Sequence, residues 1–231
     1  MLEVTSNPLF GLVLSIFMYL LGVKINQRYP HPLTTPLLFA TVGIIIFLKL
    51  TGISYEEYYK GGSMLNTLIA PSTVALGLPL YKTLHLMKHH FRSIMLGIGI
   101  GAVVNVIATA IFARFFGLEK IVALSIFPKS VTTAMAVGIS EKMSGIATIT
   151  LVSVVATGIL TSVIGANVLK WFKIEDPVAQ GIALGGTGHA IGTGKAMELG
   201  KVQGAMSGLS IGITGVVYVV VAPLIANIFL S

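Results

Sequence analysis

The chain has 231 residues, of which 55% are hydrophobic and only 10% are charged. Soluble domains carry about 25% charged residues, so this composition excludes an ordinary soluble domain and indicates an integral membrane protein. The net charge of +7 arises from Lys and Arg residues scattered over short loops, which favours membrane orientation by positive loops over nucleic-acid binding.

The hydrophobic segments predict an all-α membrane protein with about seven or eight transmembrane segments, packed as one polytopic domain over residues 1–231. The segments are long enough to cross a hydrocarbon core of about 30 Å, and the alternating pattern of barrel strands is absent. In chain order, the regular spans are Pro8–Val23, Leu33–Leu50, Ile94–Phe116, Gly145–Trp171 and Met206–Leu230.

Three further segments are interrupted by helix-breaking residues. Ser63–Tyr81 contains two prolines, Ile121–Ser140 contains Pro128, and Gly181–Gly212 contains nine glycines before Gly212. Irregular backbone is tolerated at membrane depth only where protein or a water-filled cavity satisfies its amides, and many secondary transporters build substrate sites from such discontinuous helices. We therefore expect broken or re-entrant helices. If all three cross the membrane there are eight spans; if some are re-entrant the count falls.

Weak internal repetition accompanies these interruptions. PSTVALGLPLYK (71–82) resembles PKSVTTAMAVGISEK (128–142), while a competing offset places Gly77 and Gly97 on Gly192 and Gly212. Transporter folds commonly contain such repeats. The repeat halves are expected at about 1–115 and 116–231, with the repeat unit left open by the two offsets.

Acidic residues are missing from the predicted spans, with Glu198 as the one ambiguous case. This argues against cation antiport, which needs carboxylates at the membrane midplane, and against hydrolase chemistry with paired carboxylates. Without a nucleophile–base or metal set, and with no cysteine, the sequence predicts no enzyme, no metal site and no cofactor.

Basic and hydroxyl-bearing residues do enter the interrupted segments. A lysine inside a bilayer costs about 2.5–3.5 kcal/mol, so Lys129 needs a partner, water or an anionic ligand. Helix N-termini at the breaks would add free amides, and His189 could bind the anion or carry a coupled proton. The predicted binding site for a small anionic carboxylate comprises Ser72, Thr73, Lys129, Ser130, Thr132, Thr133, Thr187, His189 and Thr193.

Each of these residues also has a purely structural interpretation. Lys129 could extend its ammonium group to the membrane interface, and His189 could bind a neighbouring carbonyl and stabilise packing. The Ser and Thr side chains could cap their own helices. Glycines at four-residue spacing predict close helix packing, within the chain or in a homo-oligomer, at Gly97, Gly101, Gly200, Gly204, Gly208 and Gly212.

Three stretches, APSTVALGLPLYK (70–82), PKSVTTAMAVGISEKMSGIATIT (128–150) and GGTGHAIGTGKAMELGKVQGAMSGL (185–209), resemble the LrgB/CidB family of bacterial membrane proteins. The resemblance covers essentially the whole chain. It implies a multi-pass protein of the bacterial cytoplasmic (inner) membrane that acts with a small LrgA/CidA-type membrane partner. It also implies two functions: holin/antiholin-like regulation of murein hydrolases and lysis, or transport of small carboxylates such as pyruvate, glycolate, glycerate and lactate. A related plant plastidal protein is linked to glycolate and glycerate transport.

The absence of acidic residues and the presence of cationic and hydroxyl groups in the interrupted segments favour a monocarboxylate transporter over a holin-like regulator. A pore-forming or regulatory subunit needs no buried cationic site and would leak solutes without saturation. The lipid bilayer is the expected environment in either case.

Overall fold

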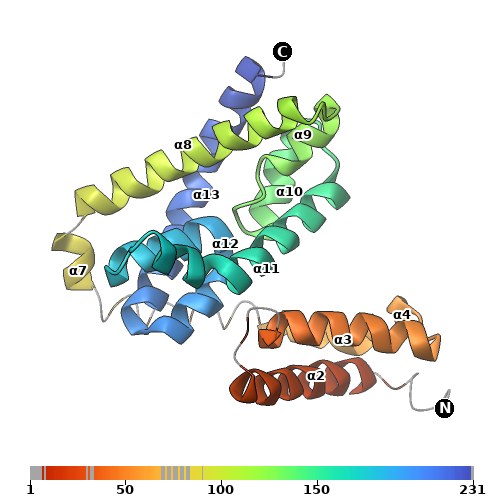
Figure 1. The fold of residues 1–231 in the computed structure, drawn as a ribbon. Coiled ribbons are helices and arrows are strands. Elements are labelled where there is room, and N and C mark those ends of the chain that lie inside the picture. Colours follow the sequence, from red (N-terminus) through yellow and green to blue (C-terminus); the bar gives the residue numbers. More distant parts are fainter. Residues whose placement is uncertain are drawn as a thin grey trace. The chain divides into compact units, whose positions relative to one another are not determined.

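The computed structural model describes residues 7, 9–29, 31, 34–68, 71, 74, 78, 81, 84–89 and 91–229, and these residues contain helices and turns without strands. The chain divides into two compact units, Met1–Ala75 and Leu76–Ser231 (Figure 1). The all-α prediction is therefore confirmed. The prediction of one polytopic domain with halves near 1–115 and 116–231 stays a prediction.

The first unit is built from α2 (Leu9–Arg28), α3 (Pro36–Thr51), α4 (Tyr55–Gly62) and the 3₁₀ helix η2 (Ser63–Leu68). The helices α3 and α4 both pack against α2. Gly11 of α2 permits this contact because a methyl group there would overlap the Tyr58 carbonyl of α4. The hydroxyl groups of Ser15 and Tyr58 then join the two helices at 2.8 Å.

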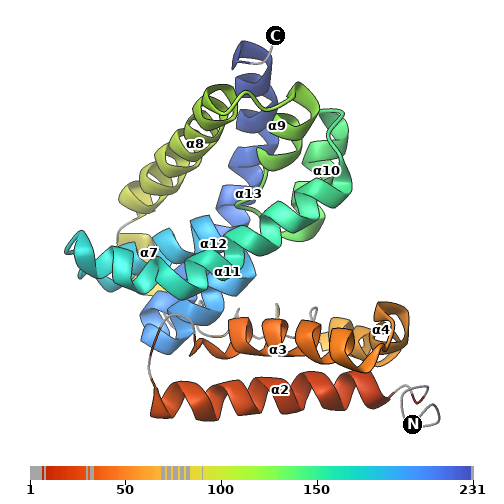
Figure 2. The same ribbon diagram turned by 45° about the vertical axis from the view of Figure 1, so that its right-hand side comes forward.

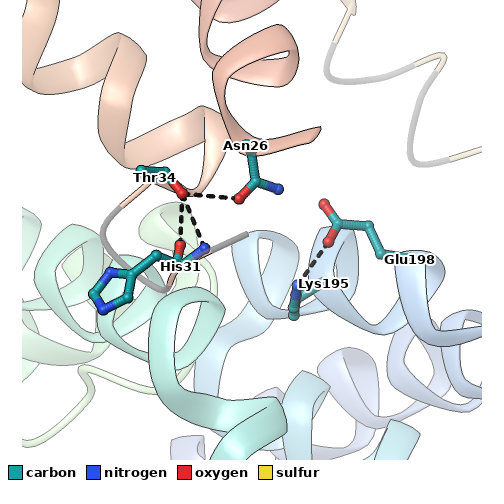
Figure 3. Close-up of polar contacts among 5 residues, drawn as sticks. All are labelled: Asn26, His31, Thr34, Lys195 and Glu198. Atoms are coloured by element: carbon teal, nitrogen blue, oxygen red, sulfur yellow. Dashed lines mark hydrogen bonds and ion pairs between the residues drawn. The ribbon is translucent and has the colours of Figure 1, made fainter. Parts of the chain in front are cut away.

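Local chemistry explains the helix ends in this unit. Gly52 ends α3 in the left-handed conformation (φ 69°) that glycine adopts without strain. Ser54 caps α4 by accepting a hydrogen bond from the Glu57 amide at 3.2 Å. The hydroxyl group of Thr34, in the α2–α3 connection, accepts from the His31 amide and lies 3.1 Å from Asn26 Oδ1 (Figure 3).

The second unit contains α7 (Leu84–His89), α8 (Phe91–Phe115), α9 (Lys120–Ile126), α10 (Thr133–Lys142), α11 (Ala147–Trp171), α12 (Pro177–Leu199) and α13 (Lys201–Phe229). Within it, α12 packs against both α11 and α13, and α8 packs against α13 (Figure 2). The main apolar core contains the fully buried side chains of Val106 in α8, Phe127 at the end of α9, Val154 in α11 and Tyr218 in α13.

Some boundaries differ from the predicted ones. The helix α2 continues to Arg28, beyond the predicted Val23, because the basic and amide side chains that follow are compatible with a helix. Between the predicted segments Leu33–Leu50 and Ser63–Tyr81, the chain forms the Ser54-capped helix α4. Instead of beginning at Met206, the last helix begins at Lys201, so its first turns belong to the glycine-rich stretch.

Four described helices are long and apolar enough to cross a membrane: Leu9–Arg28, Phe91–Phe115, Ala147–Trp171 and Lys201–Ile228. The shorter α3 is also apolar. Many large apolar side chains on these helices are exposed, including Leu96, Val152 and Val216, as expected for surfaces that face lipid. The count of seven or eight spans stays a prediction.

Candidate functional site

The polar centre of the second unit lies where the middle of α8 meets the turn between α9 and α10. Lys129 Nζ donates to Asn105 Oδ1 at 2.8 Å and also to Thr109 Oγ1. Asn105 Nδ2 donates to Ser130 Oγ at 3.1 Å. A lysine and a serine from the predicted site are thus joined through an asparagine on another helix, which the sequence interpretation had not included in the site.

Pro128 explains how the turn presents Lys129 to α8. The helix α9 ends at Ile126, and a short series of turns follows before α10 begins at Thr133. The Lys129 amide donates to the Ile126 carbonyl at 3.2 Å, and Pro128, which lacks an amide hydrogen, is fully buried. The compact turn keeps the half-buried Lys129 and the buried Ser130 directed at the same face of α8.

Hydrogen-bond donors outnumber acceptors in this cluster. An ammonium group carries three hydrogens and a side-chain amide carries two. The contacts above use two of the three ammonium hydrogens of Lys129 and one of the two side-chain amide hydrogens of Asn105. Within the described ranges, Lys129 forms no ion pair. The arrangement is therefore suited to an additional acceptor, such as an anion.

The amino terminus of α10 lies directly after this cluster. Thr132 occupies the N-cap position in an extended conformation, but its side chain makes no capping hydrogen bond. Thr133 is exposed. The predicted capping role is thus not adopted by Thr132, and neither threonine lines a cavity described below.

Two cavities meet at Asn105. One, of about 550 Å³, lies between α8 and the first half of α12 and is lined by Gly97, Gly101, Asn105, Gly186, Thr187 and Thr214 among others. The second, of about 620 Å³, runs along α8 and is lined mainly by apolar side chains together with Gly101, Asn105, Thr109 and Lys129. Of the predicted site residues, Lys129 and Thr187 therefore line cavities that share Asn105.

His189 interrupts α12 and belongs to a different cluster. Its backbone is non-helical (φ 43°, ψ −132°), and the residue is 4% exposed. Its Nε2 lies 3.0 Å from the Val154 carbonyl of α11, and the ring packs against Gly158, where an added Cβ would lie 2.8 Å from a ring carbon. This geometry corresponds to the structural interpretation of His189, a bond to a neighbouring carbonyl.

Thr193 also makes only internal contacts among the described residues. Its hydroxyl group donates to the His189 carbonyl at 2.9 Å and lies 2.7 Å from Ser207 Oγ of α13. Neither residue lines the two cavities at Asn105. The structure therefore divides the predicted site into a Lys129–Asn105 cluster and a His189–Thr193 cluster. Ser72 and Thr73 lie outside the described residues.

The glycines predicted for helix packing occupy different environments. An added Cβ at Gly204 would lie 2.7 Å from the Met197 side chain, so this glycine permits a close contact between α12 and α13. An added Cβ at Gly200, the residue between α12 and α13, would lie 2.5 Å from the end of the nearby Gln203 side chain, which is a local contact. At Gly97, Gly101 and Gly212, no described atom lies within 4 Å of an added Cβ. Packing at these three, and at Gly208, stays a prediction.

Two acidic residues of this unit, Glu198 and Asp176, make their polar contacts with groups other than Lys129. Glu198, which was ambiguous in the sequence, is exposed near the end of α12 and forms an ion pair with Lys195 at 2.8 Å (Figure 3). Asp176 caps the start of α12 by accepting from the Ala179 amide, and it lines the α8–α12 cavity at that end. In the part of the chain that the structure describes, no carboxylate reaches Lys129 or Asn105.

Three residues that the sequence interpretation did not place in the site are Asn105, Thr109 and Thr214. Asn105 and Thr109 contact the lysine directly. Thr214 is 2% exposed, lines the α8–α12 cavity, and has no hydrogen-bond partner for its hydroxyl group within the described ranges. A polar side chain within a long apolar span was the available signal, because such groups are expensive in a membrane.

Comparison with known proteins identifies relatives that match most of the chain. The model of a family described as LrgB-like matches residues 15–228. Proteins named antiholin-like protein LrgB from Bacillus cereus (strain B4264) and Bacillus anthracis (strain CDC 684 / NRRL 3495) are each 38% identical over 221 residues. Each match covers 95% of this chain and 96% of the relative. No solved structure was found to match.

Proposed function

The chain belongs to the LrgB-like family of membrane proteins, and from this premise we propose that it transports small monocarboxylates of the pyruvate, glycolate, glycerate and lactate type. The observation that carries the proposal is the excess of hydrogen-bond donors at Lys129 and Asn105. Buried polar groups normally have partners, and unused donors beside a cavity favour an acceptor-rich ligand. A carboxylate is acceptor-only and presents about four lone-pair sites.

The charge of Lys129 supports an anionic ligand over a neutral one. A lysine in the membrane interior costs about 2.5–3.5 kcal/mol, and the described residues supply amide and hydroxyl acceptors but no negative charge. A bound carboxylate would provide that charge. The mainly apolar walls of the cavity that Lys129 lines suit the short hydrocarbon portion of a monocarboxylate.

We further propose that the interrupted segments act as discontinuous membrane helices. The turn at Pro128 exposes the amino terminus of α10, and the non-helical residue His189 divides α12. Amino-terminal helix ends carry partial positive charge and free amides, which suit anionic substrates in transporters. In this scheme, Lys129–Thr133 provides the anion contact, while His189 and Thr193 hold the second interruption against α11 and α13.

The expected setting is the bacterial cytoplasmic (inner) membrane. An LrgA/CidA-type small membrane protein is the proposed partner, and a homo-oligomer is an additional proposal. Coexpression with such a partner therefore belongs in every functional assay.

The test is uptake of labelled pyruvate, glycolate and lactate into proteoliposomes, with and without the partner. We expect saturable uptake. Lys129→Met, which keeps an unbranched side chain of similar length but removes the charge, should lower uptake efficiency about 10- to 100-fold, because hydrogen bonds to charged groups contribute about 1.5–3 kcal/mol. Lys142→Met, which removes an exposed lysine at the end of α10, is the matched control.

An antiholin-like role is the second candidate, and the names of the similar Bacillus proteins favour it. Such a role needs no substrate site. Release of dyes and sugars from the same proteoliposomes without saturation, unaltered by Lys129→Met, would favour it over transport. Absence of saturable uptake of all three carboxylates, in both preparations, would refute the transporter proposal.

A further inference from the structure

The α8–α12 cavity follows two helices over a distance comparable to half a membrane. Along α8 its lining extends from Ser93 to Asn105, and along α12 from Asp176 to Thr187. These stretches advance by 12 and 11 residues, or about 18 Å and 17 Å at a helical rise of about 1.5 Å per residue. Each exceeds half of a hydrocarbon core of about 30 Å.

The two helices line the cavity in the same direction. Val178, in the first turn of α12, packs against the apolar cluster that contains Ile94, in the first turn of α8. One end of the cavity therefore lies at the helix starts, where Ser93 and Asp176 are exposed, and we call this end the mouth. The opposite end, at Asn105, is the inner end.

Small residues keep the space between these two ends open. Ser93, Gly97, Gly101 and Asn105 follow one another at four-residue spacing, which places them in one row on the surface of α8, and all four line the cavity. No described atom lies within 4 Å of a Cβ added at Gly97 or Gly101. Instead of holding another helix in close contact, this row borders the cavity.

The charges along the cavity become more favourable to an anion from the mouth to the inner end. The Asp176 carboxylate accepts from the Ala179 amide at 2.8 Å, and the amino terminus of α12 offsets its charge. The exposed Arg92 precedes Ser93 at the mouth. At the inner end, Asn105 accepts from the ammonium group of Lys129.

The volume and the lysine both favour water inside this cavity. A volume of about 550 Å³ has room for roughly 18 water molecules at about 30 Å³ each. Ionisable residues within membrane segments usually face the protein interior or a water-filled cavity, because lipid cannot solvate them. Water that reaches Asn105 also provides a path on which a small anion can approach Lys129 without crossing lipid.

We infer that the α8–α12 cavity is the aqueous entrance through which a carboxylate reaches Asn105 and Lys129, and that Gly97 and Gly101 keep this entrance open. The inference rests on the proposed function, which places the carboxylate at the inner end. Beyond Asn105, the second cavity continues along α8 with mainly apolar lining. The site is thus open to water from one side, as alternating access requires of each of its two states.

Single cysteines test whether water fills the entrance, because the chain contains no cysteine of its own. The variants Gly97→Cys and Gly101→Cys, in the full chain in lipid nanodiscs, are treated with the membrane-impermeant reagent 2-sulfonatoethyl methanethiosulfonate. Labelling is followed by intact-protein mass spectrometry. Leu96→Cys and Ile100→Cys are the matched controls, since they lie one residue earlier and are 64% and 61% exposed on the apolar surface of α8.

We expect both glycine positions to be labelled about 10-fold faster than the controls, or more, because the thiolate is the reactive form and apolar surroundings disfavour it. Ala183→Cys repeats the measurement from the α12 wall of the cavity with a smaller change in side-chain size. It should also be labelled faster than the two controls.

Protection by pyruvate connects the entrance to the site. Gly101 lies one helical turn from Asn105, so pyruvate at about ten times its apparent KM should slow labelling of Gly101→Cys about 10-fold. Adding Lys129→Met to Gly101→Cys should remove this protection and leave the cysteine reactive.

A bulky side chain provides an independent functional test. Gly101→Leu should abolish saturable pyruvate uptake into proteoliposomes, because it fills the entrance beside Asn105. Gly99→Leu should retain uptake, since Gly99 lines neither cavity at Asn105 and has no described atom within 4 Å of an added Cβ. Unfolding temperatures of the two variants in detergent confirm that the comparison is between folded proteins.

Labelling of Gly97→Cys, Gly101→Cys and Ala183→Cys at the slow rate of the controls would overturn the aqueous entrance, even where saturable uptake is observed. Fast labelling that pyruvate does not slow would also overturn it, because the water-filled space would then not lead to the substrate. Absence of saturable pyruvate uptake in the unaltered protein would instead overturn the proposed function and, with it, the carboxylate route. Fast labelling with protection supports the assignment.

Discussion

Asn105→Asp tests whether Lys129 is held available for an anionic substrate. The substitution replaces one amide with a carboxylate of nearly the same shape. In the present structure, Asn105 Oδ1 accepts from Lys129 Nζ at 2.8 Å and Nδ2 donates to Ser130 Oγ at 3.1 Å. The Ser130 hydroxyl group can rotate to donate to the new oxygen, so that contact persists with donor and acceptor exchanged, while Lys129 continues to donate to the other oxygen. Lys129 then gains a permanent counter-ion.

The magnitude follows from the observed separation. Two unit charges 2.8 Å apart attract by about 6 kcal/mol at an effective dielectric constant of about 20. Loss of hydration of the new carboxylate offsets several kcal/mol of this attraction. A net stabilisation of the ion pair by about 2 kcal/mol would weaken binding of a competing carboxylate about 30-fold.

The assay combines the concentration dependence of pyruvate uptake in proteoliposomes with thermal unfolding in detergent. We expect the apparent KM of Asn105→Asp to rise about 30-fold or more, while the unfolding temperature stays the same or increases. Gln203→Glu is the control, because it makes the same amide-to-acid change at Gln203, whose amide donates to the Gln180 side chain at 3.1 Å.

An unchanged apparent KM in Asn105→Asp would refute the assignment of Lys129 as an anion-binding residue. Equal losses in Asn105→Asp and Gln203→Glu would show a general effect of added negative charge. A lower unfolding temperature together with lost uptake would mean that the amide is a structural element of α8 packing, and it would also contradict the proposal.

Two further predictions concern the contacts that hold α12 in place. Gly185→Ala places a methyl group where it would overlap the carbonyl group of Ser207 on α13. This overlap should lower the free energy of unfolding in detergent by about 1–3 kcal/mol. Gly212→Ala is the control and should not lower it, because no described atom lies within 4 Å of an added Cβ at Gly212. At His189, the backbone φ of 43° is strained for a residue with a side chain. His189→Gly and His189→Ala both lose the ring contact with Val154, but only glycine adopts this φ without strain. The glycine variant should therefore unfold at a higher temperature than the alanine variant. Equal unfolding temperatures for the glycine and alanine variants would refute the strain argument.

The sequence predicts the helical class and the longest helices because these depend on composition and segment length. Leu9–Arg28, Phe91–Phe115, Ala147–Trp171 and Lys201–Ile228 each contain enough apolar residues to cross a membrane. Helix boundaries depend on finer effects. The helix α4 contains little apolar character, but Ser54 caps it and Gly11 allows α2 to pack closely against it.

Lys129 is predictable as a site residue because a lysine beside a proline in an apolar segment is conspicuous on its own. Its partners are not predictable in this way, since Asn105 and Thr109 lie 24 and 20 positions away in sequence and meet it only when α8 packs against the turn after α9. Sequence spacing likewise gives no indication that His189 reaches Val154, 35 positions away.

The difference between Lys129 and His189 shows why residue type alone does not identify a ligand-binding group. Both are cationic or titratable residues beside a helix interruption, but His189 directs its Nε2 to a backbone carbonyl in a buried position. Within the described residues, Lys129 contacts two side chains, has one ammonium hydrogen without an acceptor and lines a cavity. The number of unused donors, together with access to a cavity, separates a candidate ligand-binding residue from one whose visible contacts are structural.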